Sequence, residues 1–213
     1  MTIQEELYSI VLSGKRNEVE DAVQRVLDGG AAPKTIIEGT LRPAMNEVGE
    51  RFSRAEFYLP DLILAADAMK RATEYLRPLL AAEASAARPE TVVIGTAKGD
   101  LHDIGKNLVI SLLEGSGYRV IDLGVDVPIE KVVSAVREHD PVMIGFSALL
   151  TTTMVNIPVA IQALEAAGLR QGRILAVGGA PVTQRNADEW GVDLYAPDAG
   201  TAVRMLNEML ATR

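Results

Sequence analysis

After residue 90, short β-rich runs alternate with helical patterns, and this alternation limits the possible folds more than any other feature. The β-rich runs are Thr91–Ala97, Tyr118–Leu123, Val142–Ser147, Arg173–Val177 and a weaker one at Val192–Tyr195. The helical patterns lie near residues 104–116, 129–139, 154–168, 183–190 and 199–212. Strands that alternate with helices are joined by crossover connections. This half of the chain therefore predicts a doubly wound α/β domain with a five-stranded parallel sheet.

The preceding residues favour helices and contain turn residues only at expected helix ends. Pro33 and Pro60 fit first-turn positions, where a proline is tolerated, and Pro43 should kink the helix that Pro33 begins. Asn17 is the expected N-cap of an earlier helix, with Glu20 as its reciprocal capping partner. Together these patterns predict a four-helix bundle.

A stretch rich in Ala, Ser and Glu separates the two halves and predicts a linker at residues 81–90. We therefore expect a helical cap domain at residues 1–87 and an α/β domain at residues 88–213. If the cap moves during function, this linker is the expected hinge.

Charge and composition exclude several classes of protein. The net charge of -8 argues against nucleic-acid binding, since phosphate contacts need a basic surface. The chain has no cysteine, which excludes disulfides, thiolate zinc sites, iron–sulfur clusters and cysteine nucleophiles. Neither a secretory signal nor a membrane-length apolar run is visible, so we expect a cytoplasmic protein without membrane contacts.

Two histidines, His102 and His139, are therefore the nitrogen ligands available for metal chemistry. His139 is expected at a helix end, where it interacts favourably with the helix dipole, and we assign it no function. His102 follows the first β-rich run, and ligands of parallel sheets bind beyond the carboxyl ends of strands. Asp100 can reach its second ring nitrogen, which would fix the tautomer and raise the basicity of the imidazole. The alternative is a loop histidine that caps the next helix.

Two further loops carry residues that suit a ligand site. Hydroxyl groups gather after the third β-rich run, at Ser147 and Thr151–Thr153, although they could also be helix caps. The fourth run ends in Gly178 and Gly179, which would let a ligand approach the backbone closely. An ordinary strand-to-helix turn is the alternative explanation of the glycine pair.

These three loops together carry a recognisable pattern. Asp100-x-His102-x-x-Gly105, followed by Ser147-x-Leu149 and then Gly178-Gly179, resembles the signature of domains that bind cobalamin base-off and His-on. The helical half is similar to the cap of cobalamin-dependent methionine synthase and of small corrinoid proteins in methyltransferase systems. The stretches that carry this similarity are Ile37–Gly39, Met45–Phe52 and Phe57–Pro60. The resemblance spans roughly residues 30 to 200 and implies a flavodoxin-like, Rossmann-like cobalamin-binding domain behind a helical cap.

The resemblance assigns the reactive centre to three residues. His102 would replace the dimethylbenzimidazole of the vitamin as the lower ligand of cobalt. Asp100 would bind His102 through a hydrogen bond, and Thr153 would be the next member of this relay. Methionine synthases have a serine at that position, so the threonine favours the methylamine-type or methanol-type corrinoid proteins.

The resemblance also implies a wider set of residues that bind the cofactor. The nucleotide tail would lie in a slot lined by Ser147, Thr151, Gly178, Gly179 and Ala199, bordered by Tyr195. In the cap, Phe52 and Leu59 would cover the upper face and Glu38 would lie near the corrin edge, although plain bundle core is the alternative for all three. The loops complete the expected set with Gly99, Leu101, Asp103, Ile104, Gly105 and Leu149.

The implied function is that of a methyl carrier, which alternates between cob(I)alamin and methylcobalamin. It would work between a substrate-specific methyltransferase and an acceptor methyltransferase that uses a folate or a thiol, with a reductive activator. Alone, such a chain is not expected to turn over. The alternatives are a cobalamin-binding sensor or regulatory module, the cobalamin-binding part of a mutase, and a cofactor-free response-regulator-like module. The methyl donor (methanol, a methylamine, a betaine or a methoxylated aromatic) and the oligomeric state remain open.

Overall fold

The computed structural model describes residues 2–82 and 89–212, which form two compact units. A helical unit contains Met1–Pro89 together with Ser111–Gly117, and an α/β unit contains Glu90–Ile110 and Tyr118–Arg213. The expected boundary between residues 87 and 88, and residues 83–88 of the expected hinge, lie outside the described residues.

The helical unit is built from amphipathic helices that bury one face each. Its elements are α1 (Ile3–Leu12), α2 (Val19–Asp28), α3 (Pro33–Ile36), the π-helical turn η1 (Ile37–Leu41), α4 (Arg42–Ser53) and α5 (Leu59–Ala82). Leu7, Val23, Met45 and Met69 are fully or almost fully buried and come from four different helices. The predicted helical cap is therefore present, with α3, η1 and α4 running on from one another along residues 33–53.

The predicted cap at Asn17 is wrong, because α2 begins later. Glu18 occupies the N-cap position and makes no side-chain capping hydrogen bond. Residues 16–18 instead form a turn, in which the Glu18 N–H donates to the Lys15 carbonyl (3.0 Å). The helix starts at Val19, whose side chain is fully buried, so packing of this residue determines the start rather than capping.

Pro43 changes the hydrogen bonding of the helix that precedes it. A proline has no N–H and its ring crowds the carbonyl four residues earlier. The turn η1 lies directly before Pro43, and the Arg42 N–H donates to the carbonyl of Ile37, five residues back. The expected disturbance of this helix thus takes the form of a π turn, which widens the helix where the proline enters.

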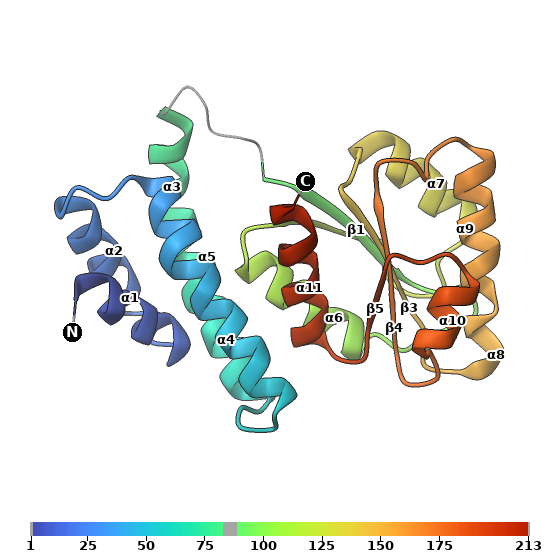
Figure 1. Ribbon diagram of the computed structural model, residues 1–213, viewed down its shortest axis with the longest axis horizontal. Helices are drawn as coiled ribbons and strands as arrows, with labels where there is room; N and C mark the ends of the chain where they lie inside the picture. Colours follow the sequence, from blue (N-terminus) through green and yellow to red (C-terminus); the bar gives the residue numbers. More distant parts are fainter. Residues whose placement is uncertain (1, 83–88, 213) are drawn as a thin grey trace. The chain divides into compact units, whose positions relative to one another are not determined.

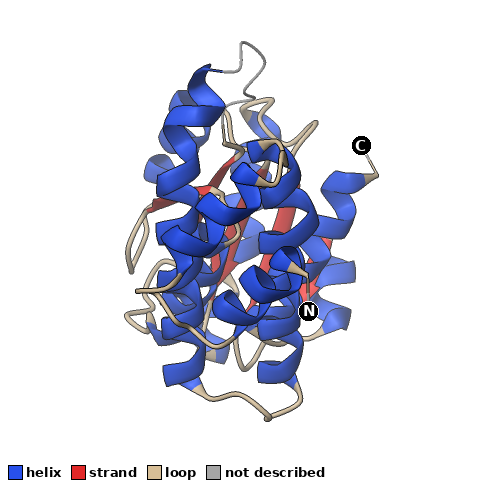
Figure 2. Ribbon diagram, turned by 90° about the vertical axis from the view of Figure 1, so that its left-hand side faces the viewer, coloured by secondary structure: helices blue, strands red, loops and turns tan. Residues whose placement is uncertain are grey.

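The α/β unit contains one sheet in which every pair of neighbouring strands is parallel, in the order β2-β1-β3-β4-β5 (Figure 1; strands red in Figure 2). The strands described are β1 (Thr91–Thr96), β2 (Arg119–Asp122), β3 (Met143–Ser147), β4 (Ile174–Gly178) and β5 (Leu194–Ala196). The helices of this half are α6 (Ile104–Gly115), α7 (Ile129–His139), α8 (Thr151–Met154), α9 (Asn156–Ala166), α10 (Gln184–Glu189) and α11 (Ala199–Ala211). The predicted five-stranded doubly wound fold is confirmed.

Helices cover both faces of this sheet. The face that carries Val93, Ile144 and Val177 packs against α7, α9 and α10 in one apolar core. In Figure 1, α6 and α11 lie on the other side of the strands. The strand order changes direction between β1 and β3, so the loops after these two strands lie next to each other at the carboxyl end of the sheet.

No helix within residues 2–82 and 89–212 combines the length and the apolar character that a bilayer crossing requires.

Candidate functional site

The loop after β1 brings a buried carboxylate together with an exposed imidazole. The Asp100 side chain is fully buried, whereas half of the His102 side chain is exposed. Asp100 Oδ1 lies 2.7 Å from His102 Nδ1 and also accepts the main-chain N–H of His102 at 3.1 Å. Because an ionised carboxylate only accepts hydrogen bonds, the shared proton of a neutral imidazole is on Nδ1. The lone pair of Nε2 therefore remains available for a ligand.

The second oxygen of Asp100 is bound by the loop after β3. Asp100 Oδ2 accepts hydrogen bonds from the Leu149 N–H (2.8 Å), the Leu150 N–H (3.3 Å) and the hydroxyl of buried Thr153 (2.6 Å). Thr153 Oγ1 also lies 3.0 Å from the Leu150 carbonyl, but the hydroxyl has one proton to donate. The shorter distance and the negative charge favour Asp100 as the acceptor. The expected hydrogen bonds from His102 to Asp100 and from Asp100 to Thr153 thus form a continuous chain.

These contacts keep the Asp100 carboxyl ionised despite its burial. Burial is the largest single influence and raises the pKa of Asp100, but hydrogen bonds from Thr153, Leu149 and His102 together outweigh it. The net result is a pKa well below the ordinary range of an aspartate. A fixed negative charge therefore lies behind the imidazole and orients it.

Large apolar side chains are exposed in the two loops that form this chain of hydrogen bonds. Leu101 and the first residue of α6, Ile104, are 71% and 79% exposed, and Leu149 and Leu150 are 44% and 43% exposed. Exposed apolar groups of this size, concentrated in the loops around one polar residue, are typical of a ligand-binding surface. Gly99 and Asp103 in the same loop, and Gly105 at the start of α6, are exposed as well.

Ser147, Gly178 and Ala196 occupy paired positions at the ends of three neighbouring strands. Ser147 pairs with Gly178, and Gly178 pairs with Ala196. Paired residues of parallel strands point to the same face, so these three small residues lie on one face at the carboxyl end of the sheet. Ala199 follows as the buried first residue of α11, and Thr151 is the exposed first residue of α8. Tyr195 differs, because its side chain packs against the core on the opposite face, with α7, α9 and α10.

The second glycine of the pair is required by the fold itself. Gly179 has a φ of 118°, and a Cβ added to it would overlap the carbonyl oxygen of Ala148. The Ala148 N–H in turn donates to the carbonyl of Gly178 (3.2 Å). This close approach holds the ends of β3 and β4 together, so Gly179 is needed for a backbone contact whether or not a ligand also approaches the glycine pair.

The remaining residues expected at the site belong to the helical unit. Glu38 is an exposed residue of η1 that pairs with Lys34 (3.7 Å). Phe52 is half-buried near the end of α4, and Leu59 is the exposed first residue of α5. His139 closes α7 at the other end of the sheet, next to Glu138 (3.7 Å).

Three residues that the sequence analysis did not identify hold the His102 loop in place. Buried Thr96 donates its hydroxyl to the carbonyl of His102 (3.0 Å). Asp126 Oδ1 accepts the N–H of Gly99 (2.6 Å), and Asn156 Nδ2 donates to the carbonyl of Lys98 (2.9 Å). Each acts on main-chain atoms, and no spacing in the sequence indicates such contacts.

A further brace ties the start of α6 to the end of β2. The Lys106 side chain is almost fully buried, and its Nζ lies 2.7 and 2.8 Å from the two carboxylate oxygens of Asp122. This pair fixes the helix that directly follows the His102 loop.

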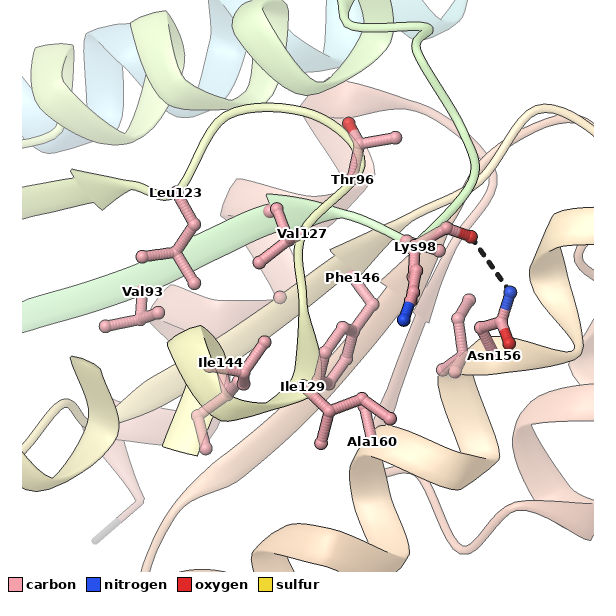
Figure 3. Close-up of a pocket in the computed structure, with 15 residues that line it drawn as sticks. Val93, Thr96, Lys98, Leu123, Val127, Ile129, Ile144, Phe146, Asn156 and Ala160 are labelled. Atoms are coloured by element: carbon pink, nitrogen blue, oxygen red, sulfur yellow. Dashed lines mark hydrogen bonds between the residues drawn. The ribbon is translucent and has the colours of Figure 1, made fainter. Parts of the chain in front are cut away.

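A small apolar pocket lies under this loop (Figure 3). Its lining includes Val93, Val127, Phe146 and Ile157, which belong to the face that α7 and α9 cover. In Figure 3, Lys98 and Asn156 lie at one side of the pocket and are joined by their hydrogen bond. Ser147 and Gly178 line the other face of the sheet, so this pocket is separate from the slot expected for a nucleotide tail.

The residues at the His102 loop fit a corrinoid. A corrin ring supplies four nitrogen ligands to its cobalt, so a protein would need to add only one imidazole with a free Nε2 as a further ligand. The exposed apolar side chains of Leu101 and Ile104 suit the flat ring, and the second hydrogen bond of the imidazole is already made.

Two protein-family models match the chain. Residues 90–204 match a family described as B12 binding domain, and residues 3–77 match a second family with the same description. The first match begins one residue before β1 and ends within α11, so it covers the whole sheet.

Curated relatives match over nearly the full length. The chain is 41% identical over 207 residues to dimethylamine corrinoid protein 1 of Methanosarcina acetivorans, covering 97% of each chain. It is 41% identical over 192 residues to the trimethylamine corrinoid protein of Methanosarcina barkeri, covering 90% of this chain and 88% of the relative.

Solved structures are similar as well. A cobalamin-binding protein from Desulfitobacterium hafniense matches with a TM-score of 0.82 and 30% identity, covering 97% of this chain and 98% of that one. The methanol:cobalamin methyltransferase complex of Methanosarcina barkeri matches with a TM-score of 0.80 and 31% identity, covering 99% of this chain and 80% of that one.

Proposed function

Because the chain belongs to the family of B12-binding corrinoid proteins, we propose that it carries a methyl group on a cobalamin held through His102. One observation carries this proposal: the exposed imidazole is fixed through Nδ1 on a buried carboxylate, 2.7 Å away, and its Nε2 is left to bind a metal. When bound, cobalamin supplies a cobalt centre that takes up a methyl group as cob(I)alamin and releases it as methylcobalamin.

The relay of Asp100 and Thr153 adjusts the strength of the His102 ligand. A carboxylate that accepts the Nδ1 proton increases electron donation from Nε2. Asp100 keeps its negative charge because Thr153 and the Leu149 N–H stabilise it. The three residues therefore favour the ligand-bound state of His102, and a shift of the shared proton towards Asp100 strengthens this ligand further.

The small residues on the α6 and α11 side of the sheet accept the displaced nucleotide tail. Ser147 supplies a hydroxyl, and the small residues Gly178, Ala196 and Ala199 lie at the strand ends and at the start of α11, where no large side chain would obstruct the tail. Thr151 borders this slot from the start of α8. Tyr195 has no part in it, since its side chain belongs to the opposite face.

In the helical unit, Phe52 and Leu59 are the residues that would supply an apolar cover for the bound cofactor, and Glu38 is the residue that would accompany the edge of its ring. An apolar cover suppresses side reactions of a reactive centre and then has to open for each partner.

The methyl donor in this proposal is a methylated amine. The support comes from the relatives at 41% identity, which are named dimethylamine and trimethylamine corrinoid proteins. The partners are then an amine-specific methyltransferase, an acceptor methyltransferase that uses a thiol or a folate, and a reductive activator that restores an oxidised cofactor.

A test of ligation compares cobalamin binding by the wild-type chain, His102→Ala and His139→Ala. We expect His102→Ala to change the absorption spectrum of the bound cofactor and to weaken binding by about 10–100-fold, the usual effect of a disturbed metal site. His139→Ala should match the wild type. Equal spectra and affinities for wild type and His102→Ala would overturn the ligand assignment.

A test of the carrier role uses the reduced cobalamin form of the protein together with its co-expressed methyltransferase. Dimethylamine, trimethylamine, methanol, a betaine and a methoxylated aromatic are offered in turn, and methylation of the cofactor is followed by absorbance. The proposal expects transfer from an amine. If cobalamin binds through His102 but no donor methylates it, the chain is a cobalamin-binding sensor and the carrier role is rejected.

A further inference from the structure

The loop between β2 and α7 runs alongside the His102 loop and extends the pairing of the sheet. The Thr96 N–H donates to the Gly124 carbonyl (3.0 Å), and the Val127 N–H donates to the Thr96 carbonyl (3.1 Å). Asp126 lies in the middle of this second loop, with a φ of 48°. Such a left-handed backbone is uncommon for a residue other than glycine, and aspartate is one of the residues that tolerate it.

This conformation lets Asp126 bind the His102 loop with both its side chain and its main chain. Its Oδ1 accepts the N–H of Gly99 at 2.6 Å, and its own N–H donates to the carbonyl of Asp100 at 2.8 Å. The two bonds hold both ends of the Gly99–Asp100 segment. The Cα of Asp100 lies between the two held groups, so the direction of its side chain is fixed.

The same segment is held from a second side. The carbonyl of Lys98 and the N–H of Gly99 belong to one peptide group, since they flank the same peptide bond. Asn156, the first residue of α9, donates to this carbonyl at 2.9 Å, while Asp126 accepts the N–H. Side chains from two separate elements therefore hold opposite edges of one peptide plane (Figure 3 shows the Asn156 bond). Gly99, with a φ of 83°, connects this plane to Asp100.

From these contacts we infer that Asp126 is a positioning residue for His102, which acts through Asp100 and is assisted by Asn156. The inference rests on the proposed function of His102 as the cobalt ligand. Asp126 binds main-chain atoms of Gly99 and Asp100, and so fixes the main chain from which the Asp100 carboxylate is aimed. Loss of this brace should let Asp100 turn, so that the imidazole is no longer held in one tautomer.

The test compares Asp126→Gly with Asp140→Gly. Glycine keeps the left-handed backbone without strain and removes only the carboxylate. Asp140 is a matched control, because it shares the left-handed backbone (φ 43°) and its carboxylate also has a partner, in this case Arg173. It lies far from His102, after α7 at the amino end of β3. Asp126→Asn is the conservative variant, since its amide oxygen can still accept the Gly99 N–H.

The first measurement uses the protein without cofactor. The ¹⁵N chemical shifts of the two histidines are recorded at about pH 8, above the ordinary titration range of imidazole, and assigned with His102→Ala. In the wild type, Asp126→Asn and Asp140→Gly, His102 should be the Nδ1-protonated tautomer. In Asp126→Gly the shifts should move towards a mixture of both tautomers. Wild-type shifts in Asp126→Gly would overturn the inference.

The second measurement is the dissociation constant for cobalamin. We expect Asp126→Gly to weaken binding about tenfold, at the lower end of the range for residues behind a metal ligand, and Asp140→Gly to change it less than about twofold. If wild type and His102→Ala bind alike, the proposed function fails, and the chemical shifts still decide the role of Asp126. If Asp126→Gly does not fold, Asn156→Ala releases the same peptide group from the other side and must show the same tautomer mixture.

Discussion

At the scale of single residues, the site depends on how Asp100 stays charged inside the protein. Its two oxygens have different tasks: Oδ1 orients His102, and Oδ2 accepts the N–H of Leu149 and the hydroxyl of Thr153. Unpaired buried charges are costly, and charged hydrogen bonds offset that cost. Each donor to Oδ2 therefore contributes both to stability and to the orientation of the imidazole.

Thr153→Val should separate this contribution from packing, because valine has nearly the shape of threonine but no hydroxyl. A hydrogen bond to a charged group contributes about 1.5–3 kcal/mol, so the free energy of unfolding should fall by that amount. Thr153→Ser keeps the donor and should stay within about 1 kcal/mol of the wild type. Urea unfolding of the three proteins measures the difference, and equal losses in both variants would contradict the assigned bond.

The lowered pKa of Asp100 predicts a pH dependence of stability. The folded-state pKa lies below the unfolded value of about 3.9, so the stabilisation is complete above that pH and is lost as the pH falls towards the folded-state pKa. Protonated aspartate resembles asparagine. The difference in unfolding free energy between wild type and Asp100→Asn should therefore be constant above about pH 5 and shrink by roughly 1 kcal/mol per pH unit below about pH 4. Urea unfolding of both proteins across this pH range measures the difference in unfolding free energy. A difference that grows as the pH falls would contradict the proposed stabilisation of the Asp100 carboxylate.

At the scale of elements, the strands and helices of the α/β unit are the part that the sequence predicted best. The five predicted runs overlap β1 to β5 because each run is rich in β-forming residues and bounded by turn residues, and β1, β3 and β4 are in addition mostly buried. The start of α2 was misplaced because burial of Val19, rather than the capping residue Asn17, determines it. The short helix α8 was not predicted as a helix, although the resemblance did imply the bond between its Thr153 and Asp100.

The contact between the ends of β3 and β4 is an element-level constraint that depends on Gly179. Gly179→Ala would place a Cβ on the Ala148 carbonyl and force a side chain into a positive φ, so we expect a loss of about 3 kcal/mol or more. Gly172→Ala is the matched control: φ is 76°, but an added Cβ meets no atom within 4 Å. It should cost only about 1 kcal/mol. Thermal unfolding compares the two, and equal losses would mean that the backbone contact is unimportant.

At the scale of the whole molecule, the sequence indicated the residues to which we assign chemistry but not those that we infer to position them. His102, Asp100 and Thr153 were found through a motif and a resemblance, and their hydrogen bonds are present in the structure. Asp126 and Asn156 act on Gly99 and Lys98 across 27 and 58 residues of sequence. Only the strand order brings these segments together, and main-chain partners leave no motif. The register between β4 and β5, which a sequence does not show, also places Tyr195 on the face opposite to Ser147 and Gly178.

The most direct test of the central claim is electron paramagnetic resonance of the protein loaded with cob(II)alamin and labelled with ¹⁵N-histidine. The unpaired electron of the cobalt couples to the nitrogen of its lower ligand. If His102 is that ligand, the coupling changes from the triplet pattern of ¹⁴N to the doublet of ¹⁵N. His139→Ala should leave the doublet in place, and His102→Ala should abolish it. A triplet that persists in the labelled wild-type protein would show that the dimethylbenzimidazole of the cofactor remains bound, and would contradict the account.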